Sequence, residues 1–479
     1  MKNLKYLFLT LILCMPIFVN AANLEVDTVA DLDACLAIDG NTCILESDIT
    51  FSATDEAILL SDNQNVVIDL NGHNITGDAA QSELFEISNA TLEIKGSGTI
   101  TAENDAFYLQ GNEVVGGAAI PANLTIGKDV KVISKTSNCV YLRGKGVKLD
   151  VYGKLESRGD FSVIQGNGTK NDTKDAGNTV ITIYDGAEVI NTYGYVDSNT
   201  LVNPAIYHPQ SGTLTIKGGK IEGVSGIEMR SGTLVVEGGT IIATAPETTS
   251  KNNGNGPALM GVGIGVAQHT TIQEVSITIN NGTVKGATAV YESTPENPHD
   301  ENIVELQING GEFVATKDGG DAVFSENKEG FITDGKFTGE IADEYAKDEF
   351  ALVEDENGNK IVLDGTKIIE LVKKMEDLLE TEEKAKQYTE ESLKTLLAVV
   401  EEMRNININS IKSQAELDAI AAKLEKAING LETHEEAKKR LEDETKNPDT
   451  ADNILIYIAA ANIALVGLTT TIVLKKRYN

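Results

Sequence analysis

A short phrase that recurs between about residues 44 and 340 limits the fold more than any other feature of the sequence. Each copy alternates apolar and polar residues over a few positions, turns at a glycine and resumes with an apolar residue. Two copies, beginning at Ser211 and Ser231, read SGTLTIKGGKIEG and SGTLVVEGGTIIA and lie 20 residues apart in register. Alternation over such short runs is typical of β-strands, and glycine suits a turn that needs a positive φ.

Seven further copies of the phrase keep this alternation. They occupy residues 68–75, 92–100, 124–132, 149–155, 181–189, 277–284 and 306–313. The repetition indicates a stacked solenoid, because one unit cannot bury its apolar face without its neighbours. The strand pattern excludes helical repeats, and the Leu and Asn spacing of leucine-rich repeats is absent. We therefore expect a mainly β fold, a parallel β-helix with roughly 20 to 30 residues per coil and Ile, Val and Leu stacked inward.

The copies of the phrase, including NVVIDLNGHNIT at residues 65–76, resemble the right-handed parallel β-helix family that contains pectate lyases and polygalacturonases. The resemblance covers residues 24–345 and implies the fold of that family without selecting a function. Longer intervals between copies are expected to be loops, which on solenoids often gather on a functional face; the alternative is surface loops without a function. These intervals are 111–121, 166–178, 192–209, 246–263 and 293–302.

A change of composition beyond Gly365 predicts a helical region. Lys, Glu, Leu and Ala dominate there, and no glycine occurs until Gly430. The hydroxyl groups of Thr389 and Ser413 are N-cap signals, and Ser413 has a glutamate three positions later. Amphipathic helices with short joints bury one another as a small bundle. Apolar residues recur at helical spacing in segments 367–388, 390–405 and 413–429.

The helical region resembles the FIVAR module, a three-helix repeat of Gram-positive surface proteins. The resemblance rests on YTEESLKTLLAVVEEM and SQAELDAIAAKLEKAINGL and spans residues 366–431, after a connector at 346–365. The module's recurring positions are Tyr388, Thr389, Ser392, Leu393, Ala415, Ala422, Leu424, Ala427, Ile428 and Leu431. The resemblance implies a surface module that acts as a spacer, with glycan binding as the alternative. Residues 432–446 are nearly all charged and are expected to form a solvated tether.

Both ends of the sequence indicate export. Lys2 and Lys5 precede an apolar stretch and small residues, which together predict a secretory signal peptide at 1–21. Residues 454–474 carry no charged side chain and precede a basic cluster at 475–477. This run is long enough to cross a bilayer as a transmembrane helix, and the basic cluster places the C-terminus in the cytoplasm. We therefore expect an extracellular protein at the cell surface that contacts the membrane through this helix.

The tail at 447–479 also resembles the sortase sorting signal of Gram-positive surface proteins, in which a pentapeptide with Pro and Thr precedes an apolar helix. The pentapeptide positions hold Asn447, Pro448, Asp449, Thr450 and Ala451. Asn447 and Ala451 depart from the usual Leu and Gly. The resemblance implies that a sortase cuts between Thr450 and Ala451 and joins the chain to peptidoglycan; the alternative is a single-pass membrane anchor.

The net charge argues against one class of partner, and the cysteines bear on disulfides and metal sites. The formal net charge of −33 repels nucleic acid, which we do not expect as a partner. Cys35 and Cys43 lie close together in an exported chain and are a candidate disulfide, which leaves Cys139 unpaired; we expect Cys139 to be a buried apolar residue. No zinc spacing is present, and we expect no metal and no cofactor.

Catalytic residues are not expected either. Hydrolysis of a glycosidic bond needs two carboxyl groups that flank it, and uronate-cleaving lyases need grouped carboxylates that act as acid and base or hold calcium. The repeats offer isolated acids, and the signatures of polygalacturonases and pectate lyases are absent. An extracellular polysaccharide lyase or glycoside hydrolase is therefore the alternative to a binding protein, together with a passive structural stalk.

A few polar and aromatic residues in or beside the repeats are candidates for binding a ligand. The chain has no Trp, so tyrosines at 141–207 would form any shallow sugar site. The alternative is that these residues point outward in solvated ladders or end the core. The candidates are Tyr141, Arg143, Arg158, Asp160, Tyr184 and Tyr207, with Arg230 as a further basic residue.

Residues 158–160 spell RGD, the tripeptide that some host integrins read. Recognition requires a tight, exposed loop, whereas LESRGDFSV predicts strands on both sides, so the sequence argues against this role. The leading hypothesis is a cell-surface anchored, non-enzymatic adhesin that binds a host or microbial glycan or surface protein.

Overall fold

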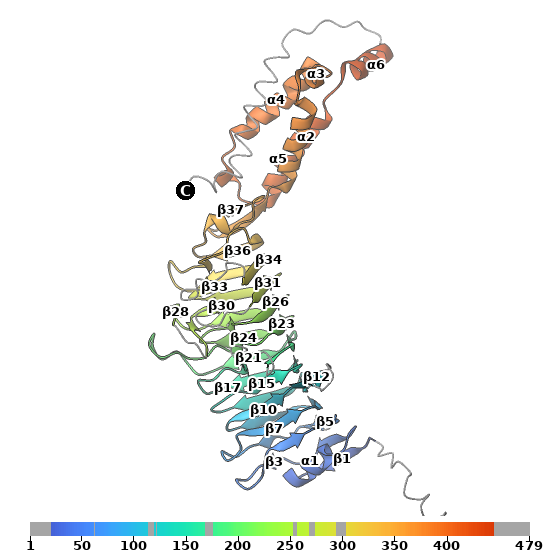
Figure 1. Ribbon diagram of the computed structural model, residues 1–479. Helices are drawn as coiled ribbons and strands as arrows, with labels where there is room; N and C mark the ends of the chain where they lie inside the picture. Colours follow the sequence, from blue (N-terminus) through green and yellow to red (C-terminus); the bar gives the residue numbers. More distant parts are fainter. Residues whose placement is uncertain are drawn as a thin grey trace, which may run out of the picture. The chain divides into compact units, whose positions relative to one another are not determined.

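The computed structural model describes residues 21–61, 63–113, 119–120, 122–167, 176–251, 256–267, 274–293 and 303–444. The chain divides into two units, residues 1–193 with 205–214, and residues 194–204 with 215–479. In each unit most strands lie in long parallel sheets, and several helices follow in the second unit (Figure 1). The structure thus confirms a mainly β chain with many parallel strands, an arrangement consistent with a β-helix solenoid.

Several predicted segments lie outside the described residues. They are residues 1–20 of the signal peptide, the sorting pentapeptide 447–451 and the membrane span 454–474. Among the residues that the structure does describe, no helix has the length and apolar composition needed to span a membrane.

Three columns of parallel strands, named A, B and C, build the first unit. Column A contains β1 (Asn23–Val26), β2 (Thr42–Leu45), β5 (Asn65–Asp69), β8 (Thr91–Lys95), β13 (Asn123–Ile126), β16 (Lys148–Val151) and β20 (Thr179–Ile183). Column B contains β3 (Ile49–Thr50), β6 (Ile75–Thr76), β9 (Gly98–Ala102), β14 (Val130–Ser134), β17 (Lys154–Ser157) and β21 (Glu188–Asn191). Column C contains β4 (Ile58–Leu60), β7 (Glu83–Ser88), β10 (Asp105–Gln110), β15 (Val140–Lys145), β18 (Ile164–Gly166) and β22 (Ile206–His208). Each coil of the chain passes through A, B and C in turn.

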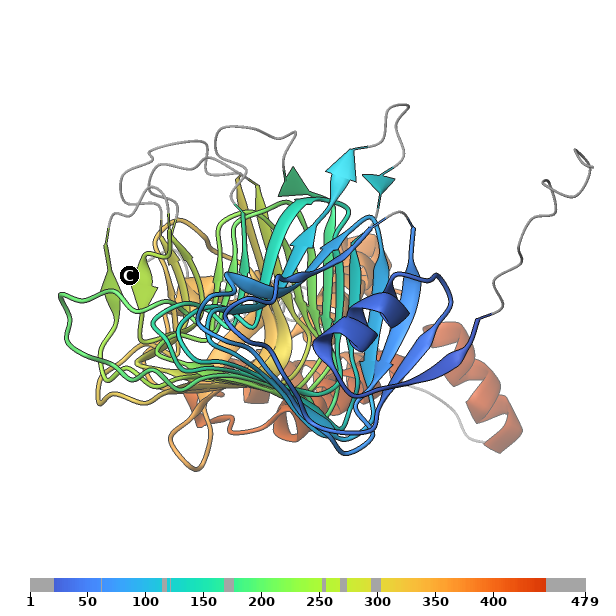
Figure 2. The same ribbon diagram turned by 90° about the horizontal axis from the view of Figure 1, so that it is seen from below.

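Equivalent residues of successive coils pair directly in these columns. Leu92 pairs with Leu124, Leu124 with Leu149, and Leu149 with Ile181. All four side chains are at most 1% exposed, because every second residue of a strand points inward. Figure 2, which looks along the stack, shows the strands of successive coils lying behind one another. The repeated phrase therefore becomes continuous apolar rows, whose burial is the main stabilising contribution to the unit.

A helix and a disulfide lie at the N-terminal end of the first unit. Helix α1 (Val29–Leu36) begins after the N-cap Thr28, whose hydroxyl accepts a hydrogen bond from the Asp31 amide. Both figures show α1, in blue, at the end of the strand stack. The sulfur atoms of Cys35 and Cys43, the pair expected from the sequence, are bonded at 2.04 Å and join α1 to β2. The sequence analysis did not predict α1, which covers apolar side chains that have no preceding coil.

The second unit also consists of parallel columns. One contains β26 (Gly232–Val236), β31 (Val275–Ile279) and the first part of β34 (Val304–Ala315). The next contains β24 (Lys220–Gly223), β27 (Thr240–Ala243), β32 (Thr283–Gly286) and the second part of β34, which pairs with β36 (Ile332–Thr338). The third contains β25 (Ile227–Met229), β30 (Val262–Ala267), β33 (Thr288–Ser293) and β35 (Val323–Ser325). The remaining long strand, β23 (Gly212–Ile216), carries residues of both units.

An antiparallel hairpin ends the parallel strands of the second unit. It consists of β37 (Phe350–Glu354) and β38 (Lys360–Asp364), and β38 pairs antiparallel with β36. The rings of Phe313 on β34 and Phe337 on β36, both fully buried, stack with centroids 5.0 Å apart in the last parallel strand pair before this hairpin. The hairpin falls within the expected connector at 346–365.

The helical region differs from the three predicted helices at two places. Its helices are α2 (Thr366–Leu379), α3 (Glu382–Ala385), α4 (Glu390–Arg404), α5 (Gln414–Asn429) and α6 (His434–Glu444). The first predicted helix is broken because Thr381 is extended and its hydroxyl accepts a hydrogen bond from the Lys384 amide, which starts α3. Helix α6 replaces most of the expected tether; Thr433 and Glu436 cap it reciprocally.

Candidate functional site

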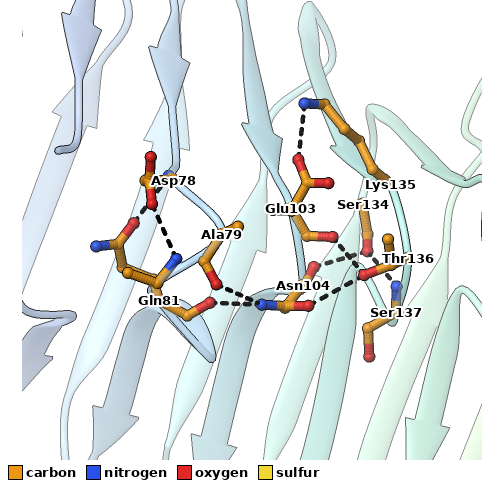
Figure 3. Close-up of polar contacts among 10 residues, drawn as sticks. Asp78, Ala79, Gln81, Glu103, Asn104, Ser134, Lys135, Thr136 and Ser137 are labelled. Atoms are coloured by element: carbon orange, nitrogen blue, oxygen red, sulfur yellow. Dashed lines mark hydrogen bonds and ion pairs between the residues drawn. The ribbon is translucent and has the colours of Figure 1, made fainter. Parts of the chain in front are cut away.

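The turns that lead from column B to column C in the first unit form a continuous row of hydrogen bonds, here named the polar corner. It consists of Gln81, Asn104, Ser134, Thr136, Ser137, Asn138, Ser157 and Asn191. Each residue bonds to a neighbouring coil, and all but Ser137 reach its backbone; the Ser137 hydroxyl donates to the Asp105 carboxylate. Figure 3 shows the first steps of the row, in which Asn104 lies between the turns at Gln81 and Thr136.

Asn104 joins three coils at this corner. Its side-chain nitrogen donates to the carbonyl oxygen of Gln81 at 2.7 Å, and its side-chain oxygen accepts from the Thr136 hydroxyl at 3.0 Å. Its own carbonyl accepts from the Ser134 hydroxyl at 2.7 Å (Figure 3). An ion pair between Lys135 and Glu103, at 2.8 Å, lies beside these bonds. These side-chain bonds pair backbone carbonyl groups of the turns, and they connect the turn of one coil to the turn of the next.

The same hydrogen-bond row holds the bend at residues 158–161 from the preceding coil. The Ser157 hydroxyl donates to the Ser137 carbonyl at 2.8 Å, and the Arg158 amide donates to the Ser134 carbonyl at 2.9 Å. The buried side chain of Asn138 donates to the Ser162 carbonyl at 2.6 Å. The backbone is therefore fixed on both sides of the bend.

The following coil holds the bend from the opposite side. Asn191, which is buried, donates from its side chain to the Phe161 carbonyl at 2.6 Å. The Thr192 amide donates to the Ser157 carbonyl at 2.9 Å. Gly159 lies so close to the preceding turn that a Cβ there would come within 2.3 Å of the Thr136 carbonyl oxygen. Only glycine allows this contact, so the bend has one fixed backbone path.

Three side chains of this bend project from the fixed backbone. Arg158 is 48% exposed, Asp160 is exposed, and Phe161 is 43% exposed. Strand β17 ends at Ser157 and β18 begins at Ile164, so Arg158, Gly159 and Asp160 occupy a bend. The expectation of strands directly flanking the RGD tripeptide is wrong on its C-terminal side, because the turn from column B to column C takes up the residues after Ser157.

The carboxylate of Glu156, beside the bend, forms two ion pairs. Its oxygens lie 2.6 Å from the Nε of Arg158 and 2.6 Å from the Nζ of Lys131. Burial raises the pKa of Glu156, but the bonds from Lys131 and Arg158 outweigh this effect and the net pKa is lowered. Glu156 thus stays ionised at neutral pH and remains paired with Lys131 when Arg158 turns away.

Two of the predicted candidates, Tyr141 and Arg143, lie on the outer face of column C. The rings of Tyr108 and Tyr141 stack with centroids 5.5 Å apart at 7°. The Nη1 of Arg143 donates to the Tyr108 hydroxyl oxygen at 3.0 Å. Burial raises the pKa of the Tyr141 hydroxyl, and the neighbouring Tyr108 adds to the rise.

Tyr184 lies elsewhere, in the turn that follows β20 of column A. Its ring stacks on Tyr152 with centroids 3.9 Å apart, and its hydroxyl donates to Asp150 at 3.2 Å. The hydrogen bond with Tyr152 and, after it, burial raise the pKa of Tyr184. Tyr207, on β22, is only 7% exposed. The six predicted candidates therefore lie on column C, in the bend after column B and in the turn after column A, and the described contacts do not bring them together at one site.

The second unit contains a polar groove on the outer side of β34. Its volume is about 770 Å³. The groove is lined by Val304, Glu305, Leu306, Gln307, Asn309, Lys328, Glu329, Gly330, Phe331, Thr333 and Lys347. Strand pairing between β34 and β36 begins at Ile308 and shifts register on both sides of Asn309, at one end of the groove. Sequence analysis did not identify this groove; the double glycine of LQINGGEF in β34 was the available signal for the irregular pairing.

Charged and amide groups dominate this groove. The Thr333 hydroxyl donates to the Asn309 side chain at 3.1 Å, and the Asn309 amide donates to Asn280 at 3.0 Å. Neither Lys328 nor Lys347 forms an ion pair with the described part of the chain. Glu305 and Glu329 also line the groove, so the lining carries both charges, and the two lysines are its groups that can pair with an anionic group of a ligand.

Other residues singled out in the sequence have structural partners. Arg230 is buried beside Glu228, and its Nη1 donates to the Gly256 carbonyl at 2.9 Å. Cys139 is fully buried, and burial raises its thiol pKa to about 12, so it is an inert core residue. Within the described ranges, no three His, Cys, Asp or Glu residues are grouped as metal ligands would be.

Comparisons with models of protein families, with curated proteins and with solved structures found no match for this chain.

Proposed function

We propose that the protein is a cell-surface, non-enzymatic binding protein that takes an acidic glycan in the groove beside β34. The observation that supports this most is the lining of the groove. Gln307, Asn309 and Thr333 offer amide and hydroxyl groups for sugar hydroxyls, and Lys328 and Lys347 offer cations for a carboxylate or sulfate. Binding sites for polar ligands are concave and hold a few such groups at fixed positions.

The roles proposed for the other segments are those of a binding protein held at the cell surface. The strands are proposed to form a right-handed parallel β-helix, which is supported by the three columns and by the repeated phrase. The helices are proposed to be a FIVAR-like spacer, and the tail a sorting signal that a sortase transfers to peptidoglycan. Mass spectrometry of material released by wall digestion tests the last point: a C-terminus at Thr450 joined to a peptidoglycan fragment is expected, and an intact Asn479 contradicts it.

A glycan array probed with the purified chain tests the binding role. We expect binding to glycans that carry uronate, sialate or sulfate groups, and reduced binding by the Lys328→Glu/Lys347→Glu variant. Lys317→Glu/Lys336→Glu makes the same charge change at lysines that do not line the groove and should bind as the wild type does. Equal binding by both variants, or no binding to any glycan, contradicts the proposal; the second result favours a passive stalk.

One observation favours an enzyme as the second candidate. Glu305 and Glu329 line the same groove as the two lysines, and paired carboxylates with a basic neighbour are the groups that hydrolases and lyases use. Incubation with acidic polysaccharides, followed by chromatography of the products, separates the two functions. Product formation that Glu305→Gln abolishes would establish the enzyme; binding without product supports the adhesin.

A further inference from the structure

We propose that the bend at residues 158–161 is a recognition loop for an integrin-class receptor, with the exposed side chains of Arg158 and Asp160 as the groups that are read; Gly159 between them is buried against the preceding turn and sets the backbone path. In such a receptor a bound divalent cation takes the carboxylate of the tripeptide, and an acidic pocket takes its guanidinium. This partner is a protein bound by the first unit. The inference therefore goes beyond glycan binding at the groove and is independent of it.

The first support is the exposure of the side chains that such a receptor contacts. The structure gives the Asp160 carboxylate no hydrogen bond and no ion pair within the described ranges, so its oxygens are open to a cation. Divalent cations such as Mg²⁺ and Ca²⁺ prefer carboxylate oxygen ligands. The apolar ring of Phe161, next in the chain, is 43% exposed and adds an aromatic contact of the kind that dominates protein interfaces.

The second support is the availability of the Arg158 guanidinium. The Arg158 side chain is 48% exposed in its ion pair with Glu156, which is 20% exposed, so water reaches the guanidinium and screens the pair in part. Glu156 also pairs with Lys131, so release of Arg158 does not leave a carboxylate without a counter-charge. Transfer of the guanidinium to a receptor carboxylate therefore exchanges one ion pair for another that is more shielded from water.

The third support is the rigidity of the backbone under these side chains. The carbonyls of Ser134 and Ser137, which accept hydrogen bonds, and the Asn138 side chain, which donates one, fix the bend on one side. Hydrogen bonds donated by Asn191 and Thr192 fix it on the other. A flexible peptide loses conformational entropy when it binds, whereas a preformed bend has already lost it. The polar corner therefore acts as the scaffold that presents the tripeptide.

Binding of purified RGD-reading integrin to the immobilised full chain tests the proposal. In Mg²⁺ we expect saturable binding that a synthetic RGD peptide competes with and that a chelator removes. Asp160→Glu keeps the charge but moves the carboxylate by one methylene, and we expect its affinity to fall by roughly tenfold or more, the effect of losing a charge-assisted contact. Asp185→Glu, an exposed aspartate in another turn, is the matched control and should bind normally.

Three results would overturn the proposal. They are absence of binding, binding that Asp160→Glu leaves unchanged, and binding that the RGD peptide does not displace. Circular dichroism of Asp160→Glu shows whether the variant is folded, and its exposed, unbonded carboxylate makes normal folding the expected result. Glycan binding by Asp160→Glu should equal that of the wild type, so a failure of the bend and a failure of the groove give different results.

Discussion

The guanidinium of Arg230 lies 3.6 Å from the carboxylate of Glu228, and the two side chains are 2% and 0% exposed. Together they hold the short hairpin of β28 (Thr249–Ser250) and β29 (Leu259–Met260). Glu228 accepts hydrogen bonds from the amides of Ala258 and Leu259, and Arg230 donates to the Gly256 carbonyl. A segment expected to be a loop at 246–263 is thus anchored by a buried ion pair.

Glu228→Ala should destabilise this hairpin by about 3 kcal/mol, because it leaves the buried amides of Ala258 and Leu259 and the buried Arg230 guanidinium without their acceptor. The double variant Glu228→Ala/Arg230→Met should be more stable than Glu228→Ala alone, because it also removes the guanidinium that has lost this acceptor. Hydrogen exchange at Ala258 and Leu259 measures the effect. If the double variant exchanges faster there than the single variant, the charge is not the cause.

The same carboxyl predicts a pH dependence. Burial raises the pKa of Glu228 from 4.5 to about 6, with Arg230 only partly opposing the rise. The folded form therefore binds this proton more tightly than the unfolded form. The proton's contribution to the free energy of unfolding is complete below pH 4.5 and is lost as the pH rises through about 6. The loss is about 2 kcal/mol. Wild type should show a step in hairpin protection across this range that Glu228→Gln lacks; parallel profiles would contradict the assignment.

Asn138→Ala should loosen the bend at 158–161 by about 1–3 kcal/mol, the cost of leaving a buried carbonyl without its donor. The carbonyl is that of Ser162, and the amides that report on it are those of Arg158 and Val163, both hydrogen-bonded to neighbouring coils. Faster hydrogen exchange at these two amides is expected. Asn199→Ala, at an exposed position, is the control and should leave them unchanged. Unaltered exchange in Asn138→Ala would show that the polar corner does not fix the bend.

The repeated phrase predicted that apolar side chains of successive coils lie in rows, because each row depends on the alternation of apolar and polar residues within one phrase. Leu92 and Leu124 are apolar at equivalent places of two phrases, so their pairing follows from the repeat itself. The start of α5 was likewise readable from Ser413 and Glu416, which are close in sequence. Such features are encoded within a few residues and need no knowledge of the stack.

The polar corner could not be predicted in the same way. The Asn138 side chain bonds to a carbonyl 24 residues away, and Asn104 bonds to residues of two other coils. Such bonds depend on the register between coils and on turn lengths, which differ along the chain. The groove at β34 brings residues 304–309 together with residues 328–333, and the exposure of Asp160 depends on where β17 ends. These features arise from tertiary stacking, and local sequence carries only weak signals for them.

Reduction of the bond between Cys35 and Cys43 should destabilise the end of the first unit. The bond closes a loop of sequence separation 8, and loss of such a cross-link costs about 2.5 kcal/mol by the chain-entropy estimate. Faster hydrogen exchange of α1 is therefore expected in reductant. The Cys35→Ser/Cys43→Ser variant should exchange rapidly with or without reductant. Equal hydrogen exchange of the wild-type protein with and without reductant would contradict a stabilising role of the disulfide.

The hairpin of β37 and β38 shares one apolar cluster with the helices. Val353 and Leu363 pack in the same cluster as Leu371, Leu396 and Leu424. The Gln414 side chain adds hydrogen bonds to the backbone of Asp364. Because the helices share a core with the last strands, we expect the two parts to unfold together.

Leu363→Ala should therefore destabilise the helices as well as the hairpin. Leu363 is 1% exposed, and removal of such a buried side chain costs about 2–5 kcal/mol. Val362→Ala, at the neighbouring half-buried position outside the cluster, is the control and should have a smaller effect. Thermal loss of the helical circular dichroism signal measures both variants. Helices that melt at the wild-type temperature in Leu363→Ala would show that they fold without the strands, since α2, α4 and α5 would then be held by their mutual contacts alone.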